Sequence, residues 1–185
     1  MEVRIEKEGM SDSEAIIACQ TGHKEMYKHL VERYKVRAYY AALMFTKNRD
    51  DALDLSQEAF CRAYRALPSF DTSKNFYTWF YRILKNLCIN FTSRNKRSQE
   101  FSEPYVDTSA HNPHEILEQH ERSQAVWQAL NQLKDNDREI IILKDFDDMS
   151  YQEISEVLSI PLGSVMSRLY YARKKLLKKL EYLNE

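Results

Sequence analysis

A basic segment near the C-terminal end carries the side chains best suited to contact with a polyanion. From Ile160 to Leu180 the chain reads IPLGSVMSRLYYARKKLLKKL, with six basic side chains and no acidic one. The net charge of the whole chain is only −1, so positive charge is concentrated here. Hydroxyl and guanidinium groups can meet base edges, and lysines can meet phosphates. The segment therefore predicts a nucleic-acid contact.

Two earlier blocks also carry charge of a single sign. Residues 74–98 hold six basic and no acidic side chains, and residues 99–121 hold six acidic and no Lys or Arg side chains. Two basic blocks around an acidic one indicate two polyanion-binding surfaces with a spacer between them.

Residues typical of enzyme active sites form no pattern. There is no P-loop, no nucleophile elbow and no Cys or His pair at metal-ligand spacing. Cys19, Cys61 and Cys88 are scattered, and we expect them to be reduced thiols that pack. The five His residues are dispersed. We expect no enzymatic activity, no metal and no cofactor. The N-terminus does not resemble a signal peptide and no apolar run could span a bilayer, which favours a cytoplasmic protein without membrane insertion.

The elements that position these residues are expected to be helices. Three Gly and four Pro in 185 residues, with apolar side chains at helical spacing, predict an all-α fold. Ser11 and Glu14 form a capping box for a first short helix, and Asp50 is expected to cap the helix that follows the break at 48–50. After the first helix, further helices are expected over 23–45, 51–67 (the helix that Asp50 would cap), 76–93, 116–133, 135–145, 150–158 and 162–183. The fold is predicted as two small helical domains, 1–97 and 115–185, joined by a flexible linker over 98–114.

The last two helices have helix-turn-helix form. Ser150 and Glu153 can make a second capping box, and Ser159–Pro161 is a short turn. An apolar stripe from Val165 to Leu180 would face inward, with Arg168 on its flank. Pointing away from the stripe are Ser164, Ser167, Tyr170, Tyr171, Lys174 and Lys178. An amphipathic surface helix with a merely solvated basic face is the alternative.

Three blocks in order resemble the extracytoplasmic-function (group IV) sigma factors of bacterial RNA polymerase. They are DDALDLSQEAFCRAYRALPSFD, NFYTWFYRILKNLCINFTSRNKR and MSYQEISEVLSIPLGSVMSRLYYARKKL. The resemblance extends from Ser11 to Leu180. It implies that the first domain binds core polymerase and opens the minus-ten element, and that the second reads the minus-thirty-five element. Core RNA polymerase, promoter DNA and an anti-sigma factor are the partners it implies.

The resemblance also assigns residues to roles. The residues that would bind core polymerase are Asp54, Leu55, Gln57 and Glu58. The minus-thirty-five element, called the upstream element below, would be contacted by the outward residues of the last helix and by Arg168. The residues that would contact the minus-ten element are Phe70, Asp71, Ser73, Lys74, Asn75, Tyr77, Trp79, Arg82 and Asn86.

Two positions depart from the family pattern and leave the base preference open. Met166 stands where many relatives carry a basic residue, and Tyr171 stands where Arg is common. A transcriptional activator with a similar helix-turn-helix, binding DNA alone as a dimer, is the competing hypothesis. The acidic docking block and the aromatic, basic helix over 76–93 argue against it.

Overall fold

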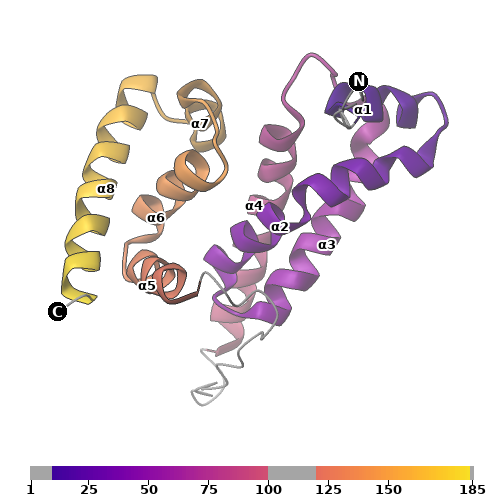
Figure 1. Cartoon of the computed structure of the whole chain (residues 1–185). Coiled ribbons are helices and arrows are strands. Elements are labelled where there is room, and N and C mark those ends of the chain that lie inside the picture. The colour runs from indigo at the N-terminus through magenta and orange to yellow at the C-terminus, as the bar shows by residue number, and fades with distance from the viewer. Residues whose placement is uncertain (1–9, 100–119, 184–185) are drawn as a thin grey trace, which may run out of the picture. The chain divides into compact units, whose positions relative to one another are not determined.

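The computed structural model describes residues 10–99 and 120–183, and the regular structure of these residues is helical (Figure 1). The chain divides into two compact units. The first holds residues 1–43 and 48–87, and the second holds 44–47 and 88–185. The prediction of an all-α protein with two helical parts is confirmed. The expected boundaries at 97 and 115 remain a prediction, since most of the expected linker lies outside the described residues.

The first unit is built from α1, most of α2, α3 and the first half of α4. Ser11 and Glu14 form the predicted capping box, with the Ser11 N–H donating to the Glu14 carboxylate at 2.8 Å. The prediction of Asp50 as a helix cap is wrong. Asn48 is the cap, because its side-chain oxygen accepts from the Asp51 N–H at 3.0 Å. The elements are α1 Asp12–Gln20, a 3-10 helix Lys24–Met26, α2 Tyr27–Thr46, α3 Arg49–Ala66, a 3-10 helix Leu67–Ser69 and α4 Phe76–Gln99.

Small side chains and aromatic rings share the core of this unit. Ala38 and Ala41 on α2 and Ala59 on α3 are fully buried, and such small residues allow helices to approach closely. Phe60 on α3 packs against Phe80 on α4 with ring centroids 4.5 Å apart. Alanines on α2 and α3 and a ring pair between α3 and α4 thus form part of this core.

Polar side chains fix the segment that leads into α4. The Gln20 amide donates to the backbone oxygens of Leu67 and Phe70, each at 2.9 Å. The Tyr27 hydroxyl donates to the Phe60 oxygen at 2.8 Å. Since these donors lie on α1 and α2, they tie α3, the 3-10 helix after it and the start of the next loop to the body of the unit.

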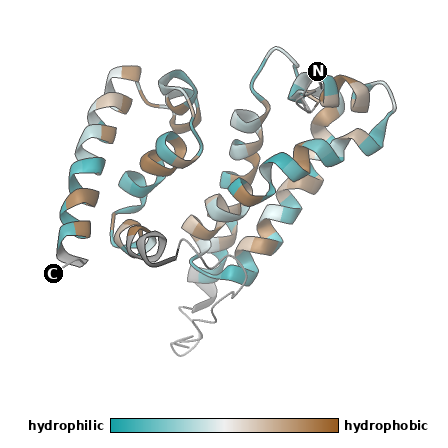
Figure 2. Cartoon of the chain, viewed as in Figure 1, coloured by the Kyte–Doolittle hydropathy of each residue, from teal (hydrophilic) through white to brown (hydrophobic). Residues whose placement is uncertain are grey.

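The second unit contains a helix-turn-helix supported by two earlier helices. Its elements are α5 His120–Asn131, α6 Asp135–Ile141, a π-helix Ile142–Phe146, α7 Tyr151–Leu158 and α8 Leu162–Leu183. The expected helix over 135–145 is thus an α-helix that widens into a π-helix. Leu130, Ile140, Ile154 and Val165 are buried in its core. Figure 2 shows alternating hydrophobic and hydrophilic bands along α8, as expected of an amphipathic helix.

Candidate nucleic-acid interface

Local hydrogen bonds set the geometry of the α7–α8 turn. Ser150 caps α7 through the predicted capping box with Glu153. At the other end of α7, Ser159 has the left-handed backbone conformation, with φ of 54°. The Ser155 hydroxyl donates to the Ile160 oxygen at 2.6 Å and closes the turn. The sequence therefore builds the predicted helix-turn-helix from interactions within a few residues.

The outward face of α8 collects most of the residues predicted to contact the upstream element. Ser164 is half-buried, and the others of this face are exposed. Their spacing of three or four residues places them on one stripe of the helix. The Ser167 hydroxyl donates to the Gly163 or Ser164 oxygen, each at 3.2 Å, which leaves its lone pairs open to a donor. The exposed members are Ser167, Tyr170, Tyr171, Lys174 and Lys178.

Four of the six cations of α8 fall into two sets. Arg173 binds Asp145 of the π-helix, with Nε donating to Oδ2 at 3.0 Å, and Lys175 binds Asp137 of α6 at 2.6 Å. The hydrogen bond from Arg173 to Asp145 raises the pKa of the guanidinium. Lys174 and Lys178 have no carboxylate partner among the residues that the structure describes. The second set is therefore the one available to an external anion.

Arg168 lies on the other flank of α8. It borders a small hollow of about 210 Å³ that is also lined by Lys134, Asp137 and Lys175. Its side chain is exposed and has no ion-pair partner in the described part of the chain. Arg168 thus lies about a quarter-turn from the lysine stripe rather than on it.

A polar and aromatic stripe runs along α4. Asn75, Trp79, Arg82 and Asn86 are spaced by four, three and four residues, so they share one side of the helix. Asn75, Arg82 and Asn86 are exposed, and Trp79 is half-buried against Phe70, with ring centroids 4.7 Å apart. The structure therefore brings four of the predicted minus-ten residues to one surface.

The loop before α4 is held by its own side chains. The Asp71 carboxylate accepts from the Ser73 N–H at 3.0 Å and from the Ser73 hydroxyl at 2.7 Å. These hydrogen bonds lower the pKa of Asp71. The Asn75 side-chain oxygen accepts from the Thr78 N–H at 2.9 Å and so caps the start of α4. Ser73 and Lys74 are exposed at the tip of this ordered loop.

Two predicted minus-ten residues lie in the interior instead. Phe70 is 7% exposed and Tyr77 is 2% exposed. The Tyr77 ring stacks on Tyr34 with centroids 5.0 Å apart, and the Arg37 guanidinium lies 3.9 Å from the Tyr77 centroid. Neither ring is available to a base in this conformation. Because aromatic residues occupy five of the six positions from 76 to 81, the sequence alone could not separate inward rings from outward ones.

The first turns of α3 form an acidic, partly apolar surface. Asp54 and Gln57 are exposed, and Leu55 is half-buried. Glu58 accepts from Arg62 Nε at 2.7 Å, which lowers the pKa of Glu58. Sequence reasoning missed Leu53, which is 48% exposed. It could have been found from the sequence, because its spacing of six residues from the buried Ala59 and ten from the buried Ala63 places Leu53 on another side of α3.

The described residues meet the requirements of neither a metal site nor a membrane span. No group of three or more His, Cys, Asp or Glu side chains within 10–99 and 120–183 could hold a metal ion. Every helix of this part of the chain is too short or too polar to span a lipid bilayer.

A basic helix-turn-helix unit in one chain with a second helical unit defines a two-part DNA-binding protein. Residues 30–98 match the family model for Sigma-70 region 2, and residues 123–176 match the model for Sigma-70, region 4. The chain is 32% identical to the ECF RNA polymerase sigma factor SigW of Bacillus subtilis, over 88% of this chain and 92% of that protein. It is 30% identical to the RNA polymerase sigma-H factor of Pseudomonas aeruginosa, over 93% and 95%.

The chain belongs to the extracytoplasmic-function (ECF) family of RNA polymerase sigma factors. Its function is that of a sigma factor in transcription initiation, which is not enzymatic. Membership decides against the dimeric activator. The solved structure of the sigma factor RpoE with the anti-sigma factor NepR, from Bartonella quintana, has the same fold. It matches with a TM-score of 0.72 at 24% identity, over 84% of this chain and 96% of that one.

Proposed function

We propose that this sigma factor divides promoter recognition between the α8 stripe and the α4 stripe, and docks on core polymerase through α3. The observation that carries the proposal is the division of the α8 cations. Asp145 and Asp137 hold Arg173 and Lys175, while Lys174 and Lys178 remain on the exposed face with Ser167. A face of that kind fits the phosphates and base edges of a duplex.

The second unit would read the minus-thirty-five element. Ser164, Ser167 and Arg168 occur in the early turns of α8, the part of a recognition helix that reaches base edges. Tyr170 and Tyr171 follow, and Lys174 and Lys178 would neutralise phosphates farther along the groove. Arg173 and Lys175, whose charges are paired within the unit, would keep α8 in place.

The first unit would act on the minus-ten element through the α4 stripe. Trp79 offers part of a ring face, Arg82 a cation, and Asn75 and Asn86 amide groups that suit base edges. Ser73 and Lys74 at the loop tip, with Asp71 holding the loop, extend this surface. Phe70 and Tyr77 would support the surface from beneath rather than contact DNA.

The α3 surface would bind core polymerase. Asp54, Gln57 and Glu58 present acceptor groups, and Leu53 and Leu55 present apolar area beside them. An acidic patch with apolar neighbours complements a basic, amphipathic partner surface. Opposite charge across such an interface chiefly sets its specificity and rate of association.

The remaining partners follow from the family. RpoE of Bartonella quintana was solved with an anti-sigma factor, and we extend that class of partner to this chain. Action on core polymerase would place the protein in the cytoplasm, with no cofactor.

Run-off transcription tests this function. Bacterial core polymerase would be supplied with a promoter library, with and without the full chain. Transcripts that depend on the added chain and share two sequence elements are expected. Equal transcript yields with and without the chain would contradict the proposal.

A further inference from the structure

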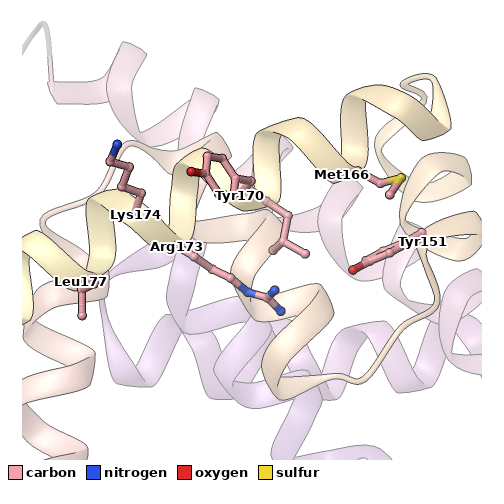
Figure 3. Close-up of a pocket in the computed structure, with 7 residues that line it drawn as sticks. Tyr151, Met166, Tyr170, Arg173, Lys174 and Leu177 are labelled. Carbon is pink, nitrogen blue, oxygen red and sulfur yellow. The ribbon is translucent and has the colours of Figure 1, made fainter.

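A hollow of about 560 Å³ lies along one side of α8 (Figure 3). Its lining is largely apolar: Met166 lies at one end beside Tyr151, Leu177 lies at the other, and Tyr170 lies between them. Met166 is 54% exposed and Tyr170 is 63% exposed. Exposed apolar side chains that line one hollow on the recognition helix form a candidate contact surface for a ligand.

Only the side of the hollow next to the outer stripe suits a phosphate. Its guanidinium, Arg173, is already held at two points by Asp145. Lys174, which has no carboxylate partner in the described part of the chain, lines the hollow on the side of the outer stripe, where Lys178 also lies. The lysines would therefore bring the DNA backbone to the outer stripe. The apolar part of the hollow would then face the base edges of that DNA.

The position of Met166 suits a base edge. It lies in the early turns of α8, between Ser164 and Ser167, and Tyr170 follows about 6 Å farther along the axis. The apolar group that bases display in the major groove is the thymine C5-methyl. A thioether has no proton to donate to the O6 and N7 acceptors of guanine. A guanine at this point would leave those acceptors unpaired, and polar groups buried without partners are unfavourable.

We propose that this hollow receives thymine methyl groups of the upstream promoter element, and that Met166 sets the base preference there, with Tyr170 as the neighbouring contact. The inference rests on the proposed reading of that element by α8. It predicts a thymine where a basic side chain at position 166 would select guanine, since Arg pairs with guanine O6 and N7.

The first test is selection from duplexes randomised over the upstream element, using the full chain with core polymerase. Wild type is expected to enrich thymine at one or two positions, and Met166→Arg is expected to change one of them to guanine. Unchanged thymine in the Met166→Arg selection would overturn the assignment to Met166. An absence of any enriched element would overturn the proposed function itself, and the inference with it.

The second test removes only the methyl group. Each enriched thymine is replaced by deoxyuridine, and binding of the holoenzyme is measured. Wild type should lose about fourfold in affinity at the contacted thymine, the value expected for one buried methyl. Met166→Ala should bind the thymine and uracil duplexes alike. Lys178→Ala, the control, should weaken both while keeping the fourfold ratio. Equal binding of the two duplexes by wild type would overturn the inference and leave the proposed function standing.

Discussion

Arg173 on α8 and Asp145 on the π-helix, 28 residues apart in sequence, form a two-point ion pair. The pair binds the middle of the recognition helix to the helix that supports it. It also removes one cation from the set available to DNA. Together with the bond between Lys175 and Asp137, it separates cations with a structural role from Lys174 and Lys178, which face outward.

Charge reversal on α3 should abolish polymerase binding. We expect the double variant Asp54→Lys, Glu58→Lys to lose retention of core polymerase in a pull-down, because the acidic surface becomes basic. Arg62→Ala is the matched control, since it breaks the same bond to Glu58 and leaves the carboxylate in place. Retention by the double variant at the wild-type level would remove α3 from the docking surface.

Asp51 should oppose folding at neutral pH. Burial raises the pKa of Asp51, and the charges of Asp54 and Asp50 raise it further. The stability that such a group contributes is present below its unfolded pKa and is lost as pH rises through its folded pKa. Asp51→Asn should therefore stabilise the first unit at pH 7, by no more than about 1 kcal/mol because exposed charges are screened.

Thermal unfolding at a series of pH values checks whether Asp51→Asn raises or lowers the stability of the first unit. The advantage of Asp51→Asn should disappear below the ordinary value of 3.8, where both chains are uncharged at this position. Glu32→Gln, an exposed change on α2, is the control. A variant less stable than wild type at pH 7, or an advantage that persists in acid, would refute the prediction.

Asn75 should serve both as a cap of α4 and as a contact to the opened strand. Asn75→Ala should destabilise the first unit by about 1 kcal/mol through loss of the cap and slow promoter opening. Asn75→Ser keeps a capping hydroxyl, so it should preserve stability and still slow opening. Permanganate reactivity of promoter thymines reports opening. Wild-type opening by the Ser variant would mean that Asn75 is only a cap.

Features with a local cause were predictable from the sequence. Both capping boxes, at Ser11 and Ser150, were predicted correctly because serine and its glutamate partner lie three residues apart. The cap of α3 was not, because Asn48 and Asp50 are both good capping residues. Only the extended backbone at Asn48, with φ of −126° and ψ of 135°, selects between them.

Features that depend on distant contacts were not predictable. The sequence could not show that Tyr77 stacks on Tyr34, since an outward ring at that position has the same spacing. Nor could it distinguish Lys174 from Lys175, which are neighbours in one basic run. Their separation depends on Asp137, 38 residues before Lys175. The segregation of charge along the chain indicated which segment binds DNA. Which of its cations face outward depends on the packing of α8 against α6 and the π-helix.

The salt dependence of duplex binding by the holoenzyme tests the central claim most directly. Two double variants of α8 each lose two cations: Lys174→Ala with Lys178→Ala, and Arg173→Ala with Lys175→Ala. The slope of log affinity against log salt is negative. If the outward pair contacts phosphates, the first variant should make that slope shallower, reducing its magnitude by about two. The second should leave the slope near that of wild type and reduce thermal stability instead. Equal losses of slope in the two variants, or a larger loss in the second, would contradict this account of the interface.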